Sequence, residues 1–107
     1  MENRIFELIP TDNRKSFYGK AKIIECKEGR YLQSYDTKVC FLSYGGTFKR
    51  LWDGYSATTM RHINSFMDYV RWNKFGGKAW WDTLIPGKEY CYSDFNAWYN
   101  MYYKIHP

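Results

Sequence analysis

Two histidines, His62 and His106, are the only side chains whose ordinary pKa places their titration near neutral pH. Acid-base catalysis at pH 7 would rest on one of them, or on a carboxyl group with a raised pKa. His62 lies in a segment with helical periodicity and has no evident catalytic partner beside it. The chain also lacks a phosphate-binding glycine loop and the motif of a nucleophile elbow. We therefore expect a structural role for His62 and a protein that is not an enzyme.

Three cysteines, Cys26, Cys40 and Cys91, are the other side chains with chemical potential. Thiolates and imidazoles are the ligands that zinc prefers, but ligand pairs separated by two to four residues, which mark zinc sites, are absent. An odd number of cysteines at wide spacing also does not suit a disulfide framework. We therefore expect reduced, separately buried thiols, with no metal and no cofactor.

Basic residues outnumber acidic ones by 16 to 11, which gives a formal net charge of +5 over 107 residues. Lysines and arginines interleaved with aromatic residues can neutralise phosphates while bases stack on the rings, as in single-strand binding. The positive charges are dispersed among acidic ones, however, which is typical of a solvated surface. Nucleic-acid contact stays open as an alternative. The basic candidates for partner contact are Lys49, Arg50, Arg71, Lys74 and Lys78.

Aromatic residues make up 21% of the chain, with 5 Trp, 11 Tyr and 7 Phe. They concentrate between Phe66 and Tyr103, where they exceed what a small core can easily hide. Tyrosine and tryptophan offer large, rigid contact areas and are enriched in the hot spots of protein interfaces. We therefore expect part of them to form an exposed partner-binding patch. Its candidates lie beside turns or off the main helical stripes: Trp80, Trp81, Tyr90, Tyr92, Tyr99 and Tyr103.

Hydrophobic periodicity indicates the elements that must position these side chains. An opening segment around Ile5 stops at Pro10. Gly29 predicts a hairpin tip at residues 27–30, because glycine tolerates the positive φ of a tight turn, and Gly45-Gly46 ends the following strand. The result is a predicted three- or four-stranded antiparallel meander. Its strands cover residues 17–26, 31–44 and 47–52.

The strand over residues 31–44 shows the alternation of a half-buried strand. One predicted face carries Tyr31, Tyr35, Thr37, Val39 and Phe41. The other predicted face carries Ser34, Asp36 and Lys38. We expect the first of these faces to pack on the core.

Past Tyr55 the hydrophobic period lengthens to about 3.6 residues, which predicts a helix from Ser56 to Trp72. Ser56 is suited to be its N-cap, and Gly76-Gly77 is expected to set its end. The stripe that faces the sheet contains Met60, Ile63, Phe66, Met67 and Val70.

The last quarter of the chain predicts a short helical turn over residues 78–85 and a type II turn at Pro86-Gly87. A final helix begins at Ser93 as N-cap, with Asp94 in its first turn. It is expected to bury Phe95, Trp98, Tyr99 and Tyr102. The whole pattern predicts a single α+β domain over residues 1–107. That domain is a three- or four-stranded antiparallel β-meander packed against one main helix, plus an aromatic C-terminal helix.

Three blocks of sequence carry a resemblance: NRKSFYGKAK at residues 13–22, YLQSYDTKVC at 31–40 and FKRLWDGYSATTMRHINSF at 48–66. The chain resembles a group of small, mostly uncharacterised proteins carried by phages and other mobile elements of Firmicutes. The resemblance covers roughly residues 13–84, leaves the tail at residues 85–107 outside, and brings no active-site residue with it. It implies a mobile-element origin, and such small proteins often block host defence by binding, anti-CRISPR proteins among them.

Two functional classes follow from these observations. The first is a non-enzymatic binding protein encoded by a phage or mobile element. Its most concrete form is an inhibitor of a host defence nuclease, such as a type II CRISPR effector, acting by occlusion through aromatic and basic residues. The alternative is a small nucleic-acid-binding accessory or regulatory protein. The sequence does not specify the oligomeric state.

The expected location is the cytoplasm of a bacterial host cell. No segment approaches the roughly 20 apolar residues of a membrane-spanning helix. Residues 1–7 lack the apolar stretch and small-residue cleavage site of a signal peptide. We therefore expect no membrane association.

Overall fold

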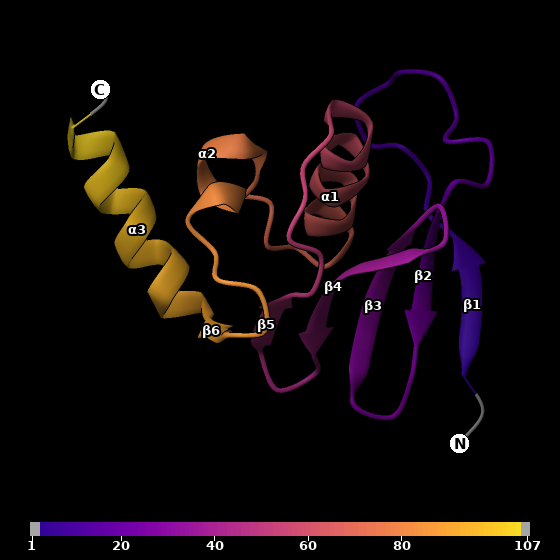
Figure 1. Cartoon of the computed structure of the whole chain (residues 1–107), viewed down its shortest axis with the longest axis horizontal. Coiled ribbons are helices and arrows are strands. Elements are labelled where there is room, and N and C mark those ends of the chain that lie inside the picture. The colour runs from indigo at the N-terminus through magenta and orange to yellow at the C-terminus, as the bar shows by residue number, and fades with distance from the viewer. Residues whose placement is uncertain (1–2, 106–107) are drawn as a thin grey trace.

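Residues 3–105, which the computed structural model describes, contain one antiparallel sheet whose six strands lie side by side in sequence order (Figure 1). His106 lies outside the described residues. The strands are β1 (Arg4–Glu7), β2 (Ala21–Glu25), β3 (Gly29–Ser34), β4 (Thr37–Ser43), β5 (Thr47–Arg50) and β6 (Glu89–Cys91). The predicted α+β class and antiparallel meander are confirmed, but the described part of the chain has six strands rather than three or four.

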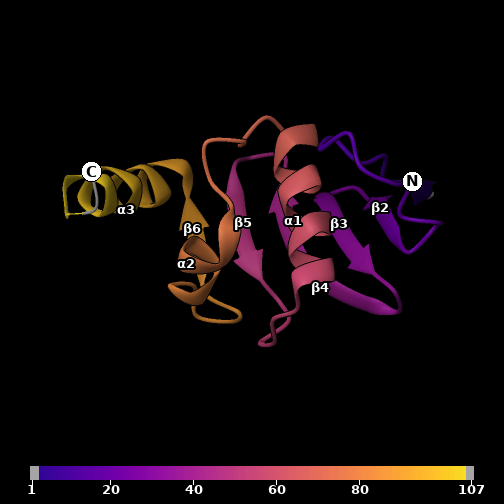
Figure 2. The same cartoon turned by 90° about the horizontal axis from the view of Figure 1, so that it is seen from above.

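The helices α1 (Ala57–Tyr69) and α2 (Gly77–Asp82) lie over one face of this sheet, and α3 (Tyr92–Ile105) leaves the β6 edge. Seen from above, α1 crosses the strands while α3 projects away from the rest of the molecule (Figure 2). The core fills the space between sheet and helices. It includes Ile23, Leu32, Cys40, Leu42 and Phe48 from the strands, with Ile63, Phe66, Met67, Trp80, Trp81 and Phe95 from the helices. In the described chain, no helix is long and apolar enough to cross a bilayer.

The expected strand over residues 31–44 is in fact two strands, β3 and β4, joined by a tight turn at Tyr35-Asp36. Ser34 pairs with Thr37 across this turn. Tyr35 takes a φ of 54°, in the left-handed region where glycine and asparagine are the usual residues. Ser34 and Asp36 are residue types common in turns, but Tyr35 between them is not, so the turn signal in the sequence is weak.

A β-bulge in β4 changes which side chains face the helices. Leu32 pairs with Cys40, but the next residue of β3, Gln33, pairs with Lys38. Val39 is thus the extra residue, and both Val39 and Cys40 are buried. The strict alternation expected for this segment is broken at Val39.

The turn at Tyr35-Asp36 and the bulge at Val39 together change several expected orientations. Ser34, expected on the exposed face, is buried, whereas Tyr31 and Phe41 lie on the face turned away from α1. Lys38 shares that face, because its Nζ lies 4.9 Å from the centroid of the Tyr31 ring. The prediction that Tyr31 and Phe41 pack on the core with Val39 is therefore wrong.

Gly29 is required for a reason other than the predicted positive φ. It is the first residue of β3, and the hairpin turn closes where the Cys26 amide donates to the Gly29 carbonyl at 2.8 Å. A Cβ at Gly29 would collide with the carbonyl oxygen of Leu42 and with Cα of Ser43. Close approach of β4 therefore selects glycine here.

Ser56 is confirmed as the N-cap of α1, since its Oγ accepts from the Thr59 amide at 3.0 Å. The helix ends at Tyr69, before the predicted Trp72, and Arg71 follows with a φ of 66°. Gly76-Gly77 does not end α1 but begins α2, where the Gly77 amide donates to Asn64 Oδ1 at 3.0 Å.

The predicted turn at Pro86-Gly87 is confirmed by a Gly87 φ of 83° and by the Lys88 amide, which donates to the Ile85 carbonyl at 3.1 Å. The final helix starts at Tyr92, one residue before the predicted cap at Ser93. Asp94 Oδ2 accepts from the Cys91 amide at 2.9 Å and so joins the end of β6 to the first turn of α3.

Candidate functional site

Trp80 and Trp81, which were expected in an exposed patch, are both 0% exposed. Trp80 packs between Phe48 of β5 and Phe95 of α3, with ring centroids 5.5 Å and 5.3 Å away. Trp81 Nε1 donates to the Gly54 carbonyl at 2.9 Å. The expectation that these two indoles are exposed is wrong, because Trp80 packs on Phe48 and Phe95, and Trp81 packs against Arg50 and the Gly54 carbonyl.

Arg50, an expected contact residue, is also buried. Its guanidinium donates to four backbone carbonyls, those of Trp52, Trp81, Leu84 and Gly54, at 2.7–3.2 Å. Every one of these bonds ties the end of β5 to the loop after it or to the end of α2. Arg50 therefore holds the fold together and is not available on the surface.

Tyr90, Tyr92, Tyr99 and Tyr103 remain at or near the surface. The Tyr90 hydroxyl accepts from the Ile85 amide at 2.9 Å, which fastens the preceding turn. Tyr92, Tyr99 and Tyr103 follow helical spacing along one side of α3. This part of the predicted patch comes together on a single helix.

The apolar side of α3 extends past the part of the helix that the sheet and the other helices cover. At 3.6 residues per turn, seven large apolar side chains fall within less than half of the helix circumference. They are Tyr92, Phe95, Trp98, Tyr99, Tyr102, Tyr103 and Ile105. Phe95 in the first turns is buried, whereas Tyr103 is 52% exposed and Ile105 is 66% exposed. The helix itself projects from the rest of the molecule (Figures 1 and 2), and its apolar side chains continue to its exposed end.

We call the outer part of this side the distal α3 surface; it comprises Trp98, Tyr99, Tyr102, Tyr103 and Ile105. Trp98 stacks on Tyr102 at a centroid distance of 5.1 Å and an interplanar angle of 27°. Tyr99 lies 4.5 Å from Tyr103. These contacts join residues four apart along the helix, while Trp98 and Tyr99 also pack against the hydrophobic core.

Of the five basic candidates, Lys74 lies closest to this surface. Its Nζ donates to Asn96 Oδ1 at 2.5 Å and lies 4.5 Å from the centroid of the Tyr99 ring. Lys78 instead pairs with Asp82 of α2 at 2.6 Å, and that hydrogen bond raises the pKa of Lys78. The predicted set therefore does not form one continuous patch.

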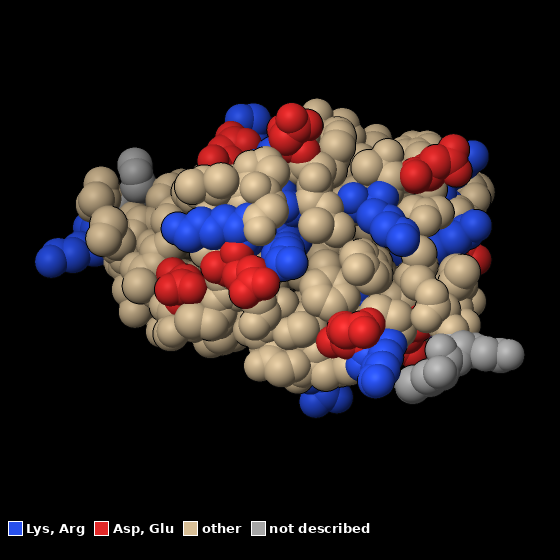
Figure 3. Space-filling model, turned by 60° about the horizontal axis from the view of Figure 1, so that its bottom comes forward, with Lys and Arg blue, Asp and Glu red and all other residues tan. Residues whose placement is uncertain are grey.

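The other basic candidates lie elsewhere. Lys49 pairs with Glu89 at 3.6 Å across β5 and β6, and Arg71 is exposed between α1 and α2. Lysines, arginines and acidic residues are interspersed on the side of the molecule turned away from α1 (Figure 3). The dispersed charge expected from the sequence is therefore seen on this face.

His62 is buried beneath Phe17, whose ring meets the imidazole edge-on at 4.5 Å. Its Nδ1 lies 2.8 Å from the Ser34 hydroxyl, which also lies 3.2 Å from the Thr59 hydroxyl. Burial and the nearby Arg61 charge lower the pKa of His62. Within residues 3–105 no carboxylate hydrogen-bonds the ring, as it would in a serine–histidine–acid triad. Ser34, Thr59 and His62 therefore satisfy one another's hydrogen-bonding groups inside the core.

The three thiols have different surroundings. Cys40 is buried, and burial raises the pKa of its thiol. Cys26 is half-buried, while Cys91 is exposed, contrary to the expectation of buried thiols. The described residues contain no cluster of three His, Cys, Asp or Glu side chains suited to a metal ion.

Comparison with known protein families finds one that matches most of the chain. Residues 6–83 match DUF8033, a protein family of unknown function. The chain belongs to this family. No curated protein and no solved structure matches the chain. The DUF8033 match runs from β1 to α2, so β6 and the distal α3 surface lie outside it.

Proposed function

We propose that this DUF8033 protein is a non-enzymatic binding protein that contacts a partner protein through the distal α3 surface. The observation that carries the proposal is the mismatch between the apolar side of α3 and the body beneath it, which leaves Tyr103 and Ile105 more than half exposed. Large aromatic and aliphatic side chains that continue past the core are typical of interaction sites.

The shape of this surface favours a protein partner with an apolar groove. A projecting helix can lay residues at i, i+4 and i+7 into such a groove, and Trp98, Tyr102 and Ile105 have this spacing. The ring pairs within α3 already order these side chains, so binding costs less conformational entropy. Lys74 beside Tyr99 suits a groove with an acidic rim.

The specific form of the proposal is that the partner is a host defence nuclease, such as a type II CRISPR effector, which the protein inhibits by occlusion in the bacterial cytoplasm. Its support is the resemblance of residues 13–84 to small mobile-element proteins of Firmicutes. The family match itself assigns no function.

A cleavage assay with a purified, guide-loaded type II effector tests this form. We expect stoichiometric protein to block DNA cleavage and direct binding to be measurable by interferometry. Absence of inhibition and of binding at a large excess would rule out this class of partner.

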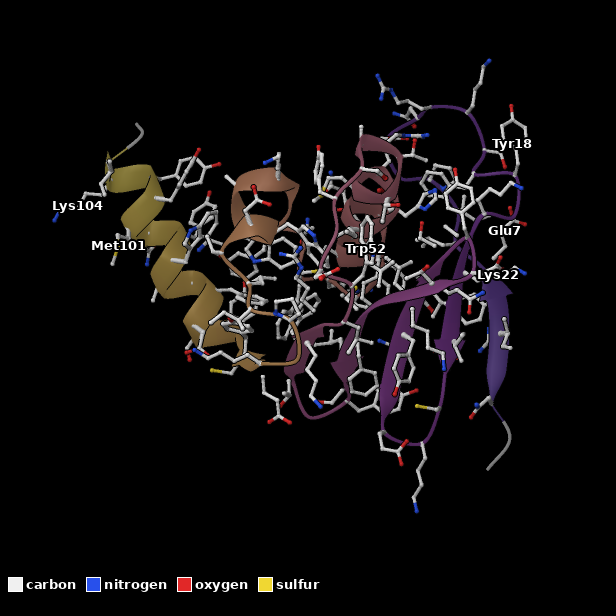
Figure 4. All side chains as sticks on the ribbon, viewed as in Figure 1. Glu7, Tyr18, Lys22, Trp52, Met101 and Lys104 are labelled. Carbon is white, nitrogen blue, oxygen red and sulfur yellow. The ribbon has the colours of Figure 1, made fainter. Side chains whose placement is uncertain are left out.

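Variants of α3 test the surface itself. Ile105→Glu and Tyr103→Ser are each expected to weaken partner binding about tenfold or more. The matched control is Lys104→Gln, because Lys104 is exposed on the side of α3 opposite its apolar side and points away from the body (Figure 4). Equal affinity of all three variants and the parent protein would assign the partner to another surface.

A further inference from the structure

The face of the sheet turned away from α1 carries a pair of aromatic rings on its two central strands. Tyr31 of β3 pairs in register with Phe41 of β4, and their ring centroids are 4.5 Å apart. No helix of the described chain covers this face. The two half-buried rings therefore form a small, partly exposed apolar platform.

Three lysines surround this platform on the same face. Lys38 has its Nζ 4.9 Å from the centroid of the Tyr31 ring, and Lys49 pairs in register with Phe41. Lys22 of β2 lies opposite Gln33, which in turn lies opposite Lys38. Figure 3 shows this side of the molecule, where lysines and arginines lie among acidic residues.

Lys22 and Lys38 have no ion-pair partner among the described residues. Glu7 lies opposite Lys22 in register, but its Oε1 accepts from the Gly19 amide at 3.0 Å. Lys49 is paired with Glu89 at 3.6 Å. The positive charge free to meet an anion therefore lies at the Lys22 and Lys38 end of the platform.

A hollow of about 250 Å³ adjoins the rings and is lined by Glu28, Tyr31, Phe41, Lys49 and Leu51. It is smaller than the roughly 300–1,000 Å³ of typical small-molecule sites, and suits a flat group resting on a ring. The Glu28 carboxylate at its rim can accept hydrogen bonds from the exocyclic amine of a base.

We propose that this face binds a single-stranded polynucleotide, with bases stacked on Tyr31 and Phe41 and phosphates beside Lys22 and Lys38. Aromatic rings stack on every base, and lysines neutralise the backbone. A duplex keeps its bases stacked within itself, so it cannot use the rings. Lysine is depleted at the centres of protein interfaces, which favours a polyanion over a protein here. This site is separate from the distal α3 surface.

Fluorescence anisotropy with the full chain tests the proposal, using labelled oligothymidylate, oligouridylate and a duplex of equal length at low salt. We expect a single strand to bind at least about tenfold more tightly than the duplex. With two phosphate contacts, log affinity should fall against log salt with a slope of about −1.4. A preference between the two single strands identifies DNA or RNA as the ligand, and binding to neither would overturn the proposal.

Matched variants locate the site. Tyr31→Leu and Phe41→Leu should each weaken single-strand binding at least about fivefold, whereas Tyr31→Phe should retain it because the ring remains. Lys38→Gln should weaken binding about threefold or more, and Lys104→Gln on α3 should not, although it removes the same charge. Lys104 points away from the body in Figure 4. Equal losses for the two lysine variants, or no loss for either leucine variant in a chain with an unchanged melting temperature, would overturn the proposal.

Discussion

The Arg50 guanidinium lies over the Trp81 indole, 4.4 Å from the ring centroid, while its Nη1 donates to the carbonyl of the same residue at 2.7 Å. Arg50 thereby holds both the side chain and the backbone of Trp81. No carboxylate of the described residues forms an ion pair with Arg50. The buried charge is balanced by carbonyl dipoles and by the face of the indole.

Replacing Arg50 should therefore destabilise the fold strongly. Arg50→Met removes the guanidinium donor from four carbonyls, of which those of Gly54 and Trp81 keep a second donor, and should lower the free energy of unfolding by roughly 2–4 kcal/mol. Arg50→Lys should recover only part of this loss, because an ammonium lacks the planar fork of a guanidinium. Denaturant titration measures both. Lys104→Met is the control for loss of an exposed charge, and an equal effect of Arg50→Met and Lys104→Met would contradict the assignment.

The two adjacent tryptophans of α2 should respond differently to the same substitution. Both are fully buried, but Trp81 Nε1 donates to the Gly54 carbonyl, whereas Trp80 Nε1 has no partner among the described residues. Trp80→Phe and Trp81→Phe remove similar apolar area. Trp81→Phe also removes a hydrogen bond and should cost about 1 kcal/mol more in unfolding free energy. Thermal or urea unfolding of the two variants measures this difference. A larger loss of unfolding free energy for Trp80→Phe than for Trp81→Phe would contradict the prediction.

His62 should make stability depend on pH in the mildly acidic range. Burial, together with the nearby Arg61 charge, holds the pKa of His62 below its ordinary value of 6.5 in the folded state. As pH falls below about 6.5, the unfolded chain takes up a proton that folded His62 does not, so stability falls with pH.

His62→Gln should flatten this dependence between about pH 7 and about pH 5, as followed by urea unfolding across the range. Asp12 acts in a lower window. The hydrogen bond from Arg61 lowers the pKa of Asp12 to about 2, so its contribution is present above 3.8 and is lost as pH falls toward 2. If the unfolding free energy of His62→Gln depends on pH between about 7 and about 5 as steeply as that of the parent protein, His62 is not the source of the pH dependence.

Substitutions at two glycines compare the cost of a steric collision with the cost of backbone strain. Gly29→Ala places a Cβ against the Leu42 carbonyl and should cost about 2 kcal/mol or more, because β4 must move. Gly46→Ala meets nothing within 4 Å but retains a φ of 92°, and should cost about 1 kcal/mol. Equilibrium unfolding compares the two variants. The reverse order would show that β4 yields easily at Gly29.

Elements with strong local signals were predictable from the sequence. The stripe from Met60 to Val70 repeats every 3.6 residues, and Ser56 bonds the first turn, so both the helix and its start followed from local chemistry. The turn at Pro86-Gly87 was predictable for the same reason. β6 was not, since its three residues become a strand only by pairing with the edge of β5.

Of the candidate sites, too, some could be predicted from the sequence and others could not. The tyrosines of α3 could be found, because helical spacing alone places Tyr92, Tyr99 and Tyr103 together. Alternation predicted that Tyr31 and Phe41 share a face, but not that this face is turned away from α1, because the turn at Tyr35 and the bulge at Val39 place Val39 on the opposite face. The burial of Arg50 could not be predicted either, because it depends on backbone carbonyls that the fold brings together and that the sequence pattern does not reveal.

Folding constrains the two halves of α3 unequally. Phe95 is enclosed by Phe48, Trp72, Phe75 and Trp80, so few residues can replace it. Past Tyr99, the side-chain rings contact mainly one another, and substitutions there leave no cavity in the body. Descendants of one ancestral chain can therefore diverge quickly at the tip of this helix while they retain the same sheet.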